Sequence, residues 1–173
     1  NYFGQSPESS SLSNIENFES RYAQLLDDLS RAKRVEARNA QRELVRTKTV
    51  LAALIGLNLK DSIWDLLDAK GRYQNTISAI INLIVAESII RPVVLEIEDA
   101  HWMDENSREL LAEFTRQMPR FPFALIMTFR YLDDGTKPQL LPDEQIRQLG
   151  LPVRETDLNT LQPEAVKEFA ELR

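Results

Sequence analysis

The sequence predicts an α/β fold in which a mostly parallel sheet is flanked by helices and preceded by a helix-rich segment. Two short apolar runs, residues 93–98 and 123–129, have the length and the β-branched or aromatic content of strands. A helical pattern lies between them, so the three together predict a βαβ unit with a right-handed crossover. Residues 123–129 are apolar on both faces except at Thr128, which is typical of a parallel sheet covered on both sides.

The composition predicts a folded cytoplasmic protein. The 173 residues are 43% hydrophobic, which is enough for a core, and the net charge of −6 argues against a dedicated nucleic-acid binder. The absence of cysteine excludes disulfides, thiolate metal sites and a cysteine nucleophile, and it fits a reducing compartment. No apolar run reaches the roughly 18 residues that span a bilayer, so we expect no membrane partner.

Residues 1–66 are predicted to be helix-rich after a flexible start. Residues 1–14 hold Gly4, Pro7 and several serines, which favours a poorly packed lead-in. Helical spacing of apolar residues then indicates more than one helix over 15–55, with Gly56 as the terminator. The arginines and lysines of residues 30–48 form either a basic binding surface or, more simply, a solvated helix face with i,i+4 ion pairs.

The next segment contains the clearest helix. Residues 57–73 predict a short helix with turns, and residues 74–90 predict a helix whose broad apolar stripe packs against a large surface. Pro92 ends that helix before the first strand. Asp104 is placed to cap a further helix over 105–118.

Beyond the second strand the pattern weakens. We expect, in order, a polar loop at 133–137, a short helix near 142–149, an edge strand at 153–158 and a helix at 162–172 that has Pro163 in its first turn. Residues 67–173 are therefore predicted to form the α/β part of the chain.

Candidate chemistry lies at the end of the first strand. Glu98 and Asp99 follow an apolar run and should emerge at its carboxyl end, where α/β enzymes often hold a metal or position a water. Glu98 could hold Mg²⁺ through water, and Asp99 could orient or deprotonate an attacking water. One alternative is that both acids only end a strand in solvent. Another is a metal site built from Glu96, Glu98 and His101, which no second histidine supports.

The neighbouring residues carry a resemblance to a known family. Residues 98–104, Glu-Asp-Ala-His-Trp-Met-Asp, resemble the extended Walker B segment of the STAND class of AAA-related P-loop ATPases, as in MalT-type and LuxR-type regulators or cyclase- and kinase-associated proteins. In that family a helix follows, and then a strand that ends in threonine, an aromatic residue and arginine. Residues 128–130, Thr-Phe-Arg, match that ending. The resemblance covers roughly residues 67–172.

The resemblance implies a role for each matching residue. Glu98 and Asp99 take the places of the two Walker B acids, which bind Mg²⁺ and ATP. Asp99 would position the attacking water and Arg130 would act as a sensor arginine near the γ-phosphate, so these two are the expected catalytic residues. The supporting positions are His101, Trp102, Asp104 and Thr128. On residue type alone, Trp64 and Trp102 are expected to be core or half-buried packing residues.

Two departures from the family pattern occur in the strand itself. Glu98 stands where aspartate is commoner, and Glu96 places a charge on a strand that is usually apolar. By strand alternation Glu96 points to the same side as Glu98, which would mark an exposed strand face.

The phosphate-binding loop of the family is missing. No pair of the five glycines fits Gly-x-x-x-x-Gly-Lys-Ser/Thr, and the family pattern would place that loop just before Asn1. We therefore expect the chain to be part of an ATPase domain that binds nucleotide weakly or not at all by itself.

The parent protein would be an ATP/ADP-controlled switch in a multidomain signalling or transcription-regulatory protein. Its partners would be nucleotide, the other domains of the same chain and a second copy through self-association, with no membrane contact and no nucleic acid bound by this segment. The alternative is a non-catalytic interaction module in which residues 15–90 bind a partner and the acids are vestigial.

Overall fold

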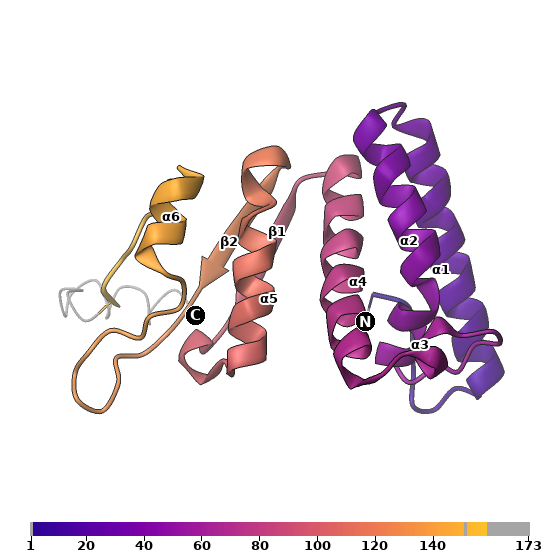
Figure 1. The fold of residues 1–173 in the computed structure, drawn as a ribbon, viewed down its shortest axis with the longest axis horizontal. Coiled ribbons are helices and arrows are strands. Elements are labelled where there is room, and N and C mark those ends of the chain that lie inside the picture. Colours follow the sequence, from indigo (N-terminus) through magenta and orange to yellow (C-terminus); the bar gives the residue numbers. More distant parts are fainter. Residues whose placement is uncertain (1, 151, 159–173) are drawn as a thin grey trace, which may run out of the picture.

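The computed structural model describes residues 2–150 and 152–158. The helices α1 (Ser11–Arg31), α2 (Val35–Leu54) and α4 (Ala69–Ile90) lie side by side, and the short α3 (Ile63–Leu66) lies near one end of them (Figure 1). The prediction of more than one helix over residues 15–55 is confirmed by α1 and α2. Gly56 ends α2 in the left-handed conformation, with φ of 77°, as expected.

The core of this bundle is formed by one face of each helix. In α1, four side chains at helical spacing are buried: Phe18, Tyr22, Leu25 and Leu29. They meet Leu44 and Val50 of α2, which are also fully buried. On α4 the buried contacts are made by small residues, Ala79 and Ala86, which allow its backbone to approach α2 closely.

Side-chain caps fix where α1 and α4 begin. The Ser10 hydroxyl accepts the Ser13 amide proton at 3.1 Å at the start of α1. At the start of α4, the Asp68 carboxylate accepts the Gly71 amide proton at 2.7 Å. This cap starts the helix at Ala69 rather than at residue 74, so the sequence-based boundary is wrong there.

The expected flexible start is also corrected. Phe3 is buried in the bundle core, and its ring lies 4.8 Å from that of Phe18. The side-chain amide of Asn14 donates to the Ser6 carbonyl at 2.9 Å, and its side-chain oxygen accepts the Ser6 amide proton at 3.0 Å. An aromatic side chain in the core outweighs the turn-forming composition, so the residues before α1 are packed against the bundle.

The second part of the chain is a small α/β unit. Strand β1 (Val93–Ile97) pairs in parallel with β2 (Phe123–Met127), and α5 (Glu105–Thr115) connects them after a 3-10 turn. The register runs from Val93 opposite Phe123 to Ile97 opposite Met127. The fold is therefore mixed α/β and rich in helix, with a two-stranded parallel sheet among the described residues.

The two faces of this sheet differ, and the expected covering on both sides is not found. Phe123 on one face lies 5.0 Å, centroid to centroid, from Phe114 of α5. The opposite face carries Val94 and Ile126, which are 62% and 50% exposed, and also Glu96 and Ala124. The sequence-based inference that Glu96 marks an exposed face is confirmed.

The segment after β2 contains α6 (Asp143–Leu149), close to the predicted 142–149. The edge strand predicted at 153–158 is wrong, because residues 152–157 have no regular secondary structure. Side-chain contacts hold that segment instead: Lys137 pairs with Glu155, and the Tyr131 hydroxyl donates to Asp157 at 3.2 Å. The helix predicted at 162–172 lies outside the described residues.

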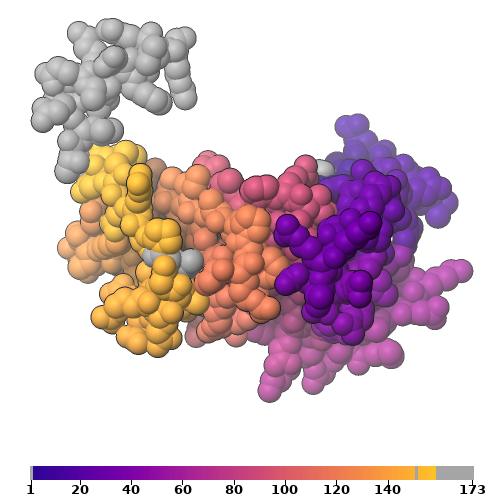
Figure 2. Space-filling view, turned by 90° about the horizontal axis from the view of Figure 1, so that it is seen from above, coloured from indigo at the N-terminus to yellow at the C-terminus, as the bar shows by residue number. Residues whose placement is uncertain are grey.

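The molecule is elongated. Figure 2 shows the helical bundle, indigo to magenta, and the sheet with α6, orange to yellow, at opposite ends of the body. Within the described residues, we find no helix with the length and hydrophobicity needed to cross a bilayer.

Candidate functional site at the carboxyl ends of the strands

Backbone hydrogen bonds join the segments that follow β1 and β2. The Thr128 amide donates to the Ile97 carbonyl at 3.0 Å, and the Ala100 amide donates to the Thr128 carbonyl at 2.8 Å. The Asp99 amide donates to the Thr128 hydroxyl at 3.1 Å. Thr128 therefore fixes the path of the chain through Glu98 and Asp99.

The two acids sit on a sharp bend. Asp99 has φ of 50° and ψ of 41°, a left-handed conformation that is uncommon outside glycine, asparagine and aspartate. It is the N-cap position of the 3-10 turn Ala100–Trp102, whose Ala100 is buried. The bend leaves both Glu98 and Asp99 exposed at the end of β1, so the predicted position at the strand tip is found.

His101 connects the same two segments through its ring. Its Nδ1 accepts the Arg130 amide proton at 3.3 Å and lies 3.9 Å from an Asp99 carboxylate oxygen. Nδ1 is the acceptor in this bond, so the imidazole ring links the segment after β1 to the segment after β2 and holds the loop.

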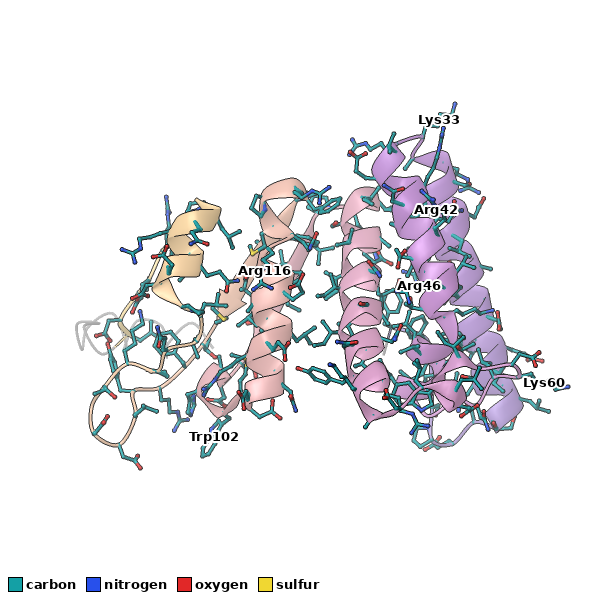
Figure 3. The ribbon with its side chains drawn as sticks, in the orientation of Figure 1. Lys33, Arg42, Arg46, Lys60, Trp102 and Arg116 are labelled. Carbon is teal, nitrogen blue, oxygen red and sulfur yellow. The ribbon has the colours of Figure 1, made fainter. Side chains whose placement is uncertain are left out.

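Trp102 differs from the expectation of a half-buried packing residue. It is 80% exposed, and its ring lies tilted against that of His101 at 5.2 Å. Figure 3 shows it projecting beyond the end of α5 that begins at Glu105. The 3-10 turn buries its first residue and directs its last outward, which explains the exposure. Trp64 is half-buried against the bundle core, as expected.

Arg130 is brought to the same edge of the sheet by its position after β2. Its backbone is held by the His101 ring, whereas its side chain is exposed. Among the described residues, no carboxylate forms an ion pair with its guanidinium. The predicted set of Glu98, Asp99 and Arg130 therefore lies on two neighbouring segments that hydrogen bonds hold together.

The donor set fits a hydrated Mg²⁺ better than a fully coordinated metal. Within the described part of the chain, no group of three or more histidine, aspartate and glutamate side chains could hold a metal. The alternative site built from Glu96, Glu98 and His101 is therefore not found. Two exposed carboxylates suit Mg²⁺, because this ion keeps several of its waters.

Asp104 caps α5, as predicted. Its carboxylate accepts the Ser107 amide proton at 2.8 Å, and hydrogen bonds from Ser107 hold the pKa of Asp104 below its usual value. A lowered pKa means that the carboxylate stabilises the fold above the ordinary aspartate pKa of about 3.9, and that this stabilisation is lost on acidification.

We expect Asp104→Ala to lower the Tm by a few degrees at pH 7, because α5 loses its cap. The difference from the native chain should shrink as the pH falls below about 4. Asp104→Ser should lower the Tm at pH 7 much less than Asp104→Ala, because a hydroxyl can also cap the helix. In this variant the contribution of the cap to the Tm should no longer depend on pH. Thermal unfolding monitored by circular dichroism measures all three chains. Equal Tm losses for Ala and Ser at pH 7 would contradict the capping role.

A cavity lies beside β2. It measures about 490 Å³ and lies between the sheet, α6 and the segments on either side of α6. Its apolar lining includes Leu125, Met127 and Phe129, the side chains of β2 and its extension that alternate with the exposed face. The cavity is distinct from the exposed acids. Its only sequence signal was the unbroken apolar character of residues 123–127.

Comparison with known proteins gives little further information. No protein-family model matches the chain, and no solved structure matches it. One curated protein, an uncharacterised protein of Rhizobium meliloti (strain 1021), is 46% identical over 39 residues. That match covers 22% of this chain and 4% of the other protein.

Proposed function

We propose that the chain is the Walker B to sensor part of a STAND-type ATPase domain. The observation that carries the proposal is the arrangement around Thr128, which joins the bend bearing Glu98 and Asp99 to the segment bearing Arg130. Two acids and an arginine at the carboxyl ends of neighbouring parallel strands are suited to phosphoryl chemistry.

The sheet has an unpaired edge and an open face. Val93 donates to the Pro122 carbonyl, and Thr128 donates to the Ile97 carbonyl, so the intervening Leu125 and Met127 direct their N–H and C=O groups away from β1. No described strand pairs with that edge. Parallel sheets are normally larger and covered on both faces. These features support a sheet that continues in further strands, as a P-loop domain requires.

In the proposed mechanism each residue has one task. Asp99 accepts a hydrogen bond from the attacking water and aligns it. Arg130 stabilises negative charge on the phosphate oxygens as the reaction proceeds. Glu98 and Asp99 together would hold Mg²⁺, which neutralises charge on the phosphates when bound. His101 and Thr128 keep the two segments in register. ATP and ADP would then favour different arrangements of the domain, as in a nucleotide-controlled switch.

The test uses the full natural protein that contains these residues. Asp99→Asn is expected to reduce ATP turnover about 10²- to 10⁴-fold, because the change removes the group that aligns water, and to weaken Mg²⁺–ATP binding less than about tenfold, because Glu98 remains. Phosphate release measures turnover, and isothermal titration measures binding.

Asp65→Asn is the matched control, since Asp65 is an exposed acid on α3 in the helical bundle. It should leave both turnover and binding unchanged. Unchanged turnover in Asp99→Asn would refute the role of Asp99. The absence of any Mg²⁺–ATP binding by the full protein would refute the ATPase proposal as a whole.

A further inference from the structure

The side of α2 that faces away from the core carries charge of one sign. It consists of Arg34, Val35, Arg38, Arg42 and Val45, all exposed, which we name the basic face of α2. At 3.6 residues per turn these five positions fall within an arc of about 100°. The two acids of the helix, Glu36 and Glu43, lie outside that arc. A chain whose net charge is −6 thus presents a face with three arginines and no acid.

The simpler interpretation, a solvated helix with i,i+4 ion pairs, does not explain this face. The helix does contain an i,i+3 ion pair outside the face, Arg46 with Glu43 at 2.9 Å. Among the described residues, Arg34 and Arg38 have no acidic partner, and Arg42 donates only to the side-chain oxygen of Asn39 at 2.7 Å. The neighbouring Lys33, which Figure 3 shows projecting from the end of the bundle, is likewise without an acidic partner in the described chain.

Two of these cations, Lys33 and Arg34, lie where they reduce the stability of the helix. Arg34 is the N-cap residue of α2, and its side chain makes no capping hydrogen bond. A helix N-terminus carries partial positive charge, so cations there are unfavourable. Lys33 adopts φ of 48°, a conformation that favours glycine. Residues that lower stability at an exposed site suggest a role in binding.

Exposed apolar side chains near both ends of the face identify the kind of partner. Val35 is 68% exposed and Val45 is 60% exposed, ten positions apart on one side of the helix. Arginine binds carboxylates through two parallel hydrogen bonds, and the valines offer apolar contact beside them. We propose that the basic face of α2, together with Lys33, binds an acidic amphipathic helix of a partner protein. This interaction is independent of the nucleotide chemistry proposed above.

Other anionic partners fit the face less well. A membrane surface requires a wide apolar stripe of large side chains, and this face has only two valines. Nucleic acid would use the arginines but not the valines, and the negative charge of the rest of the chain would oppose its approach. An acidic amphipathic helix can contact both the arginines and the valines of the face. Helix α2 is long enough for a second helix to pack along it.

The probe is a synthetic helical peptide with glutamate at every fourth position and leucine three positions after each glutamate. We expect the 173-residue chain to bind it, and Arg38→Gln/Arg42→Gln to weaken binding about tenfold, the scale of two lost exposed ion pairs. The matched control, Lys60→Gln/Lys70→Gln, removes the same charge from exposed positions outside α2 and should leave affinity within about twofold. Fluorescence anisotropy of the labelled peptide measures each affinity.

Three comparisons decide the nature of the partner. A peptide with glutamine in place of glutamate should bind at least tenfold more weakly, and Val35→Ser/Val45→Ser should weaken binding of the acidic peptide about threefold. A 20-base-pair DNA duplex and phosphatidylserine vesicles should bind more weakly than the acidic peptide. Tighter binding of DNA or vesicles, no binding of the acidic peptide, or an equal loss in the lysine control would overturn the proposal.

A single substitution separates binding from stability. Arg34→Ser should raise the urea concentration at the midpoint of unfolding, because it supplies the missing N-cap. The same change should weaken peptide binding about threefold, since it removes one cation from the face. Urea unfolding and anisotropy measure the two effects. Unchanged binding in this more stable chain would show that Arg34 is only a surface residue.

Discussion

Phe18→Ala should lower the free energy of unfolding by about 3–5 kcal/mol, which is the largest effect expected for a single substitution in the helical bundle. Phe18 is fully buried. Its ring lies 4.8 Å from that of Phe3 and 5.6 Å from that of Tyr22, so its removal leaves a cavity bounded by aromatic rings and by α2. Domains of this size have about 5–15 kcal/mol of net stability, so the variant should be partly unfolded at 37 °C.

Urea unfolding followed by circular dichroism at 222 nm measures this loss. Leu12→Ala in the same helix is the matched control, because Leu12 is exposed, and it should change stability by no more than about 0.5 kcal/mol. If Phe18→Ala cost less than about 1.5 kcal/mol at an unchanged m value, the aromatic cluster would not be the centre of the core.

The helical bundle was the most predictable part of the fold. Phe18, Tyr22, Leu25 and Leu29 follow the helical period, and such spacing of apolar residues predicted helix over residues 15–55. Helix boundaries were less predictable, since α4 begins at Ala69 where Asp68 caps it. A cap depends on one hydrogen bond, and the sequence offers several polar residues that could make it.

The features that the sequence did not predict depend on contacts between distant residues. Phe3 lies among turn-forming residues, and its burial depends on a place beside Phe18 that only the assembled bundle provides. The strand expected at residues 153–158 does not form, and side-chain contacts such as that of Lys137 with Glu155 join this segment to the loop after β2. Trp102 is exposed because it is the last residue of a tight turn, not because its residue type favours water.

The candidate site was predictable in position but not in construction. Because the carboxyl ends of parallel strands meet at one edge, Glu98, Asp99 and Arg130 could be placed together from the sequence. The bond from the Asp99 amide to the Thr128 hydroxyl, and that from the Arg130 amide to His101, depend on the register of the two strands. Two short runs of similar residues do not specify such a register.

Glu87→Ala should lower the free energy of unfolding by about 2–3 kcal/mol, because its carboxylate links three segments of the chain. Glu87, in the last turn of α4, is buried and accepts hydrogen bonds from the Tyr2 hydroxyl and from Arg21 at 2.7 Å. Arg91, just before β1, lies 3.2 Å from its other oxygen. Removal of the carboxylate leaves the half-buried Arg21 and the Tyr2 hydroxyl without this partner.

The contribution of the Tyr2 bond can be isolated with a double-mutant cycle. Tyr2→Phe should cost about 1 kcal/mol in the native chain and much less in the Glu87→Ala background, since the acceptor is already absent. Burial, together with the bond to Glu87, raises the pKa of Tyr2 well above its usual value of about 10.

A raised pKa means that stability is present below pH 10 and is lost as the tyrosine ionises above it. Tyr2→Phe should therefore lose less stability than the native chain between about pH 9 and pH 11, measured by urea unfolding. Tyr22, whose pKa burial also raises, keeps part of the alkaline sensitivity in both chains. Two results together would show that the residues before α1 are not anchored through Glu87. Tyr2→Phe would cost the same free energy of unfolding in the native chain and in the Glu87→Ala background, and the native chain and Tyr2→Phe would lose stability equally at alkaline pH.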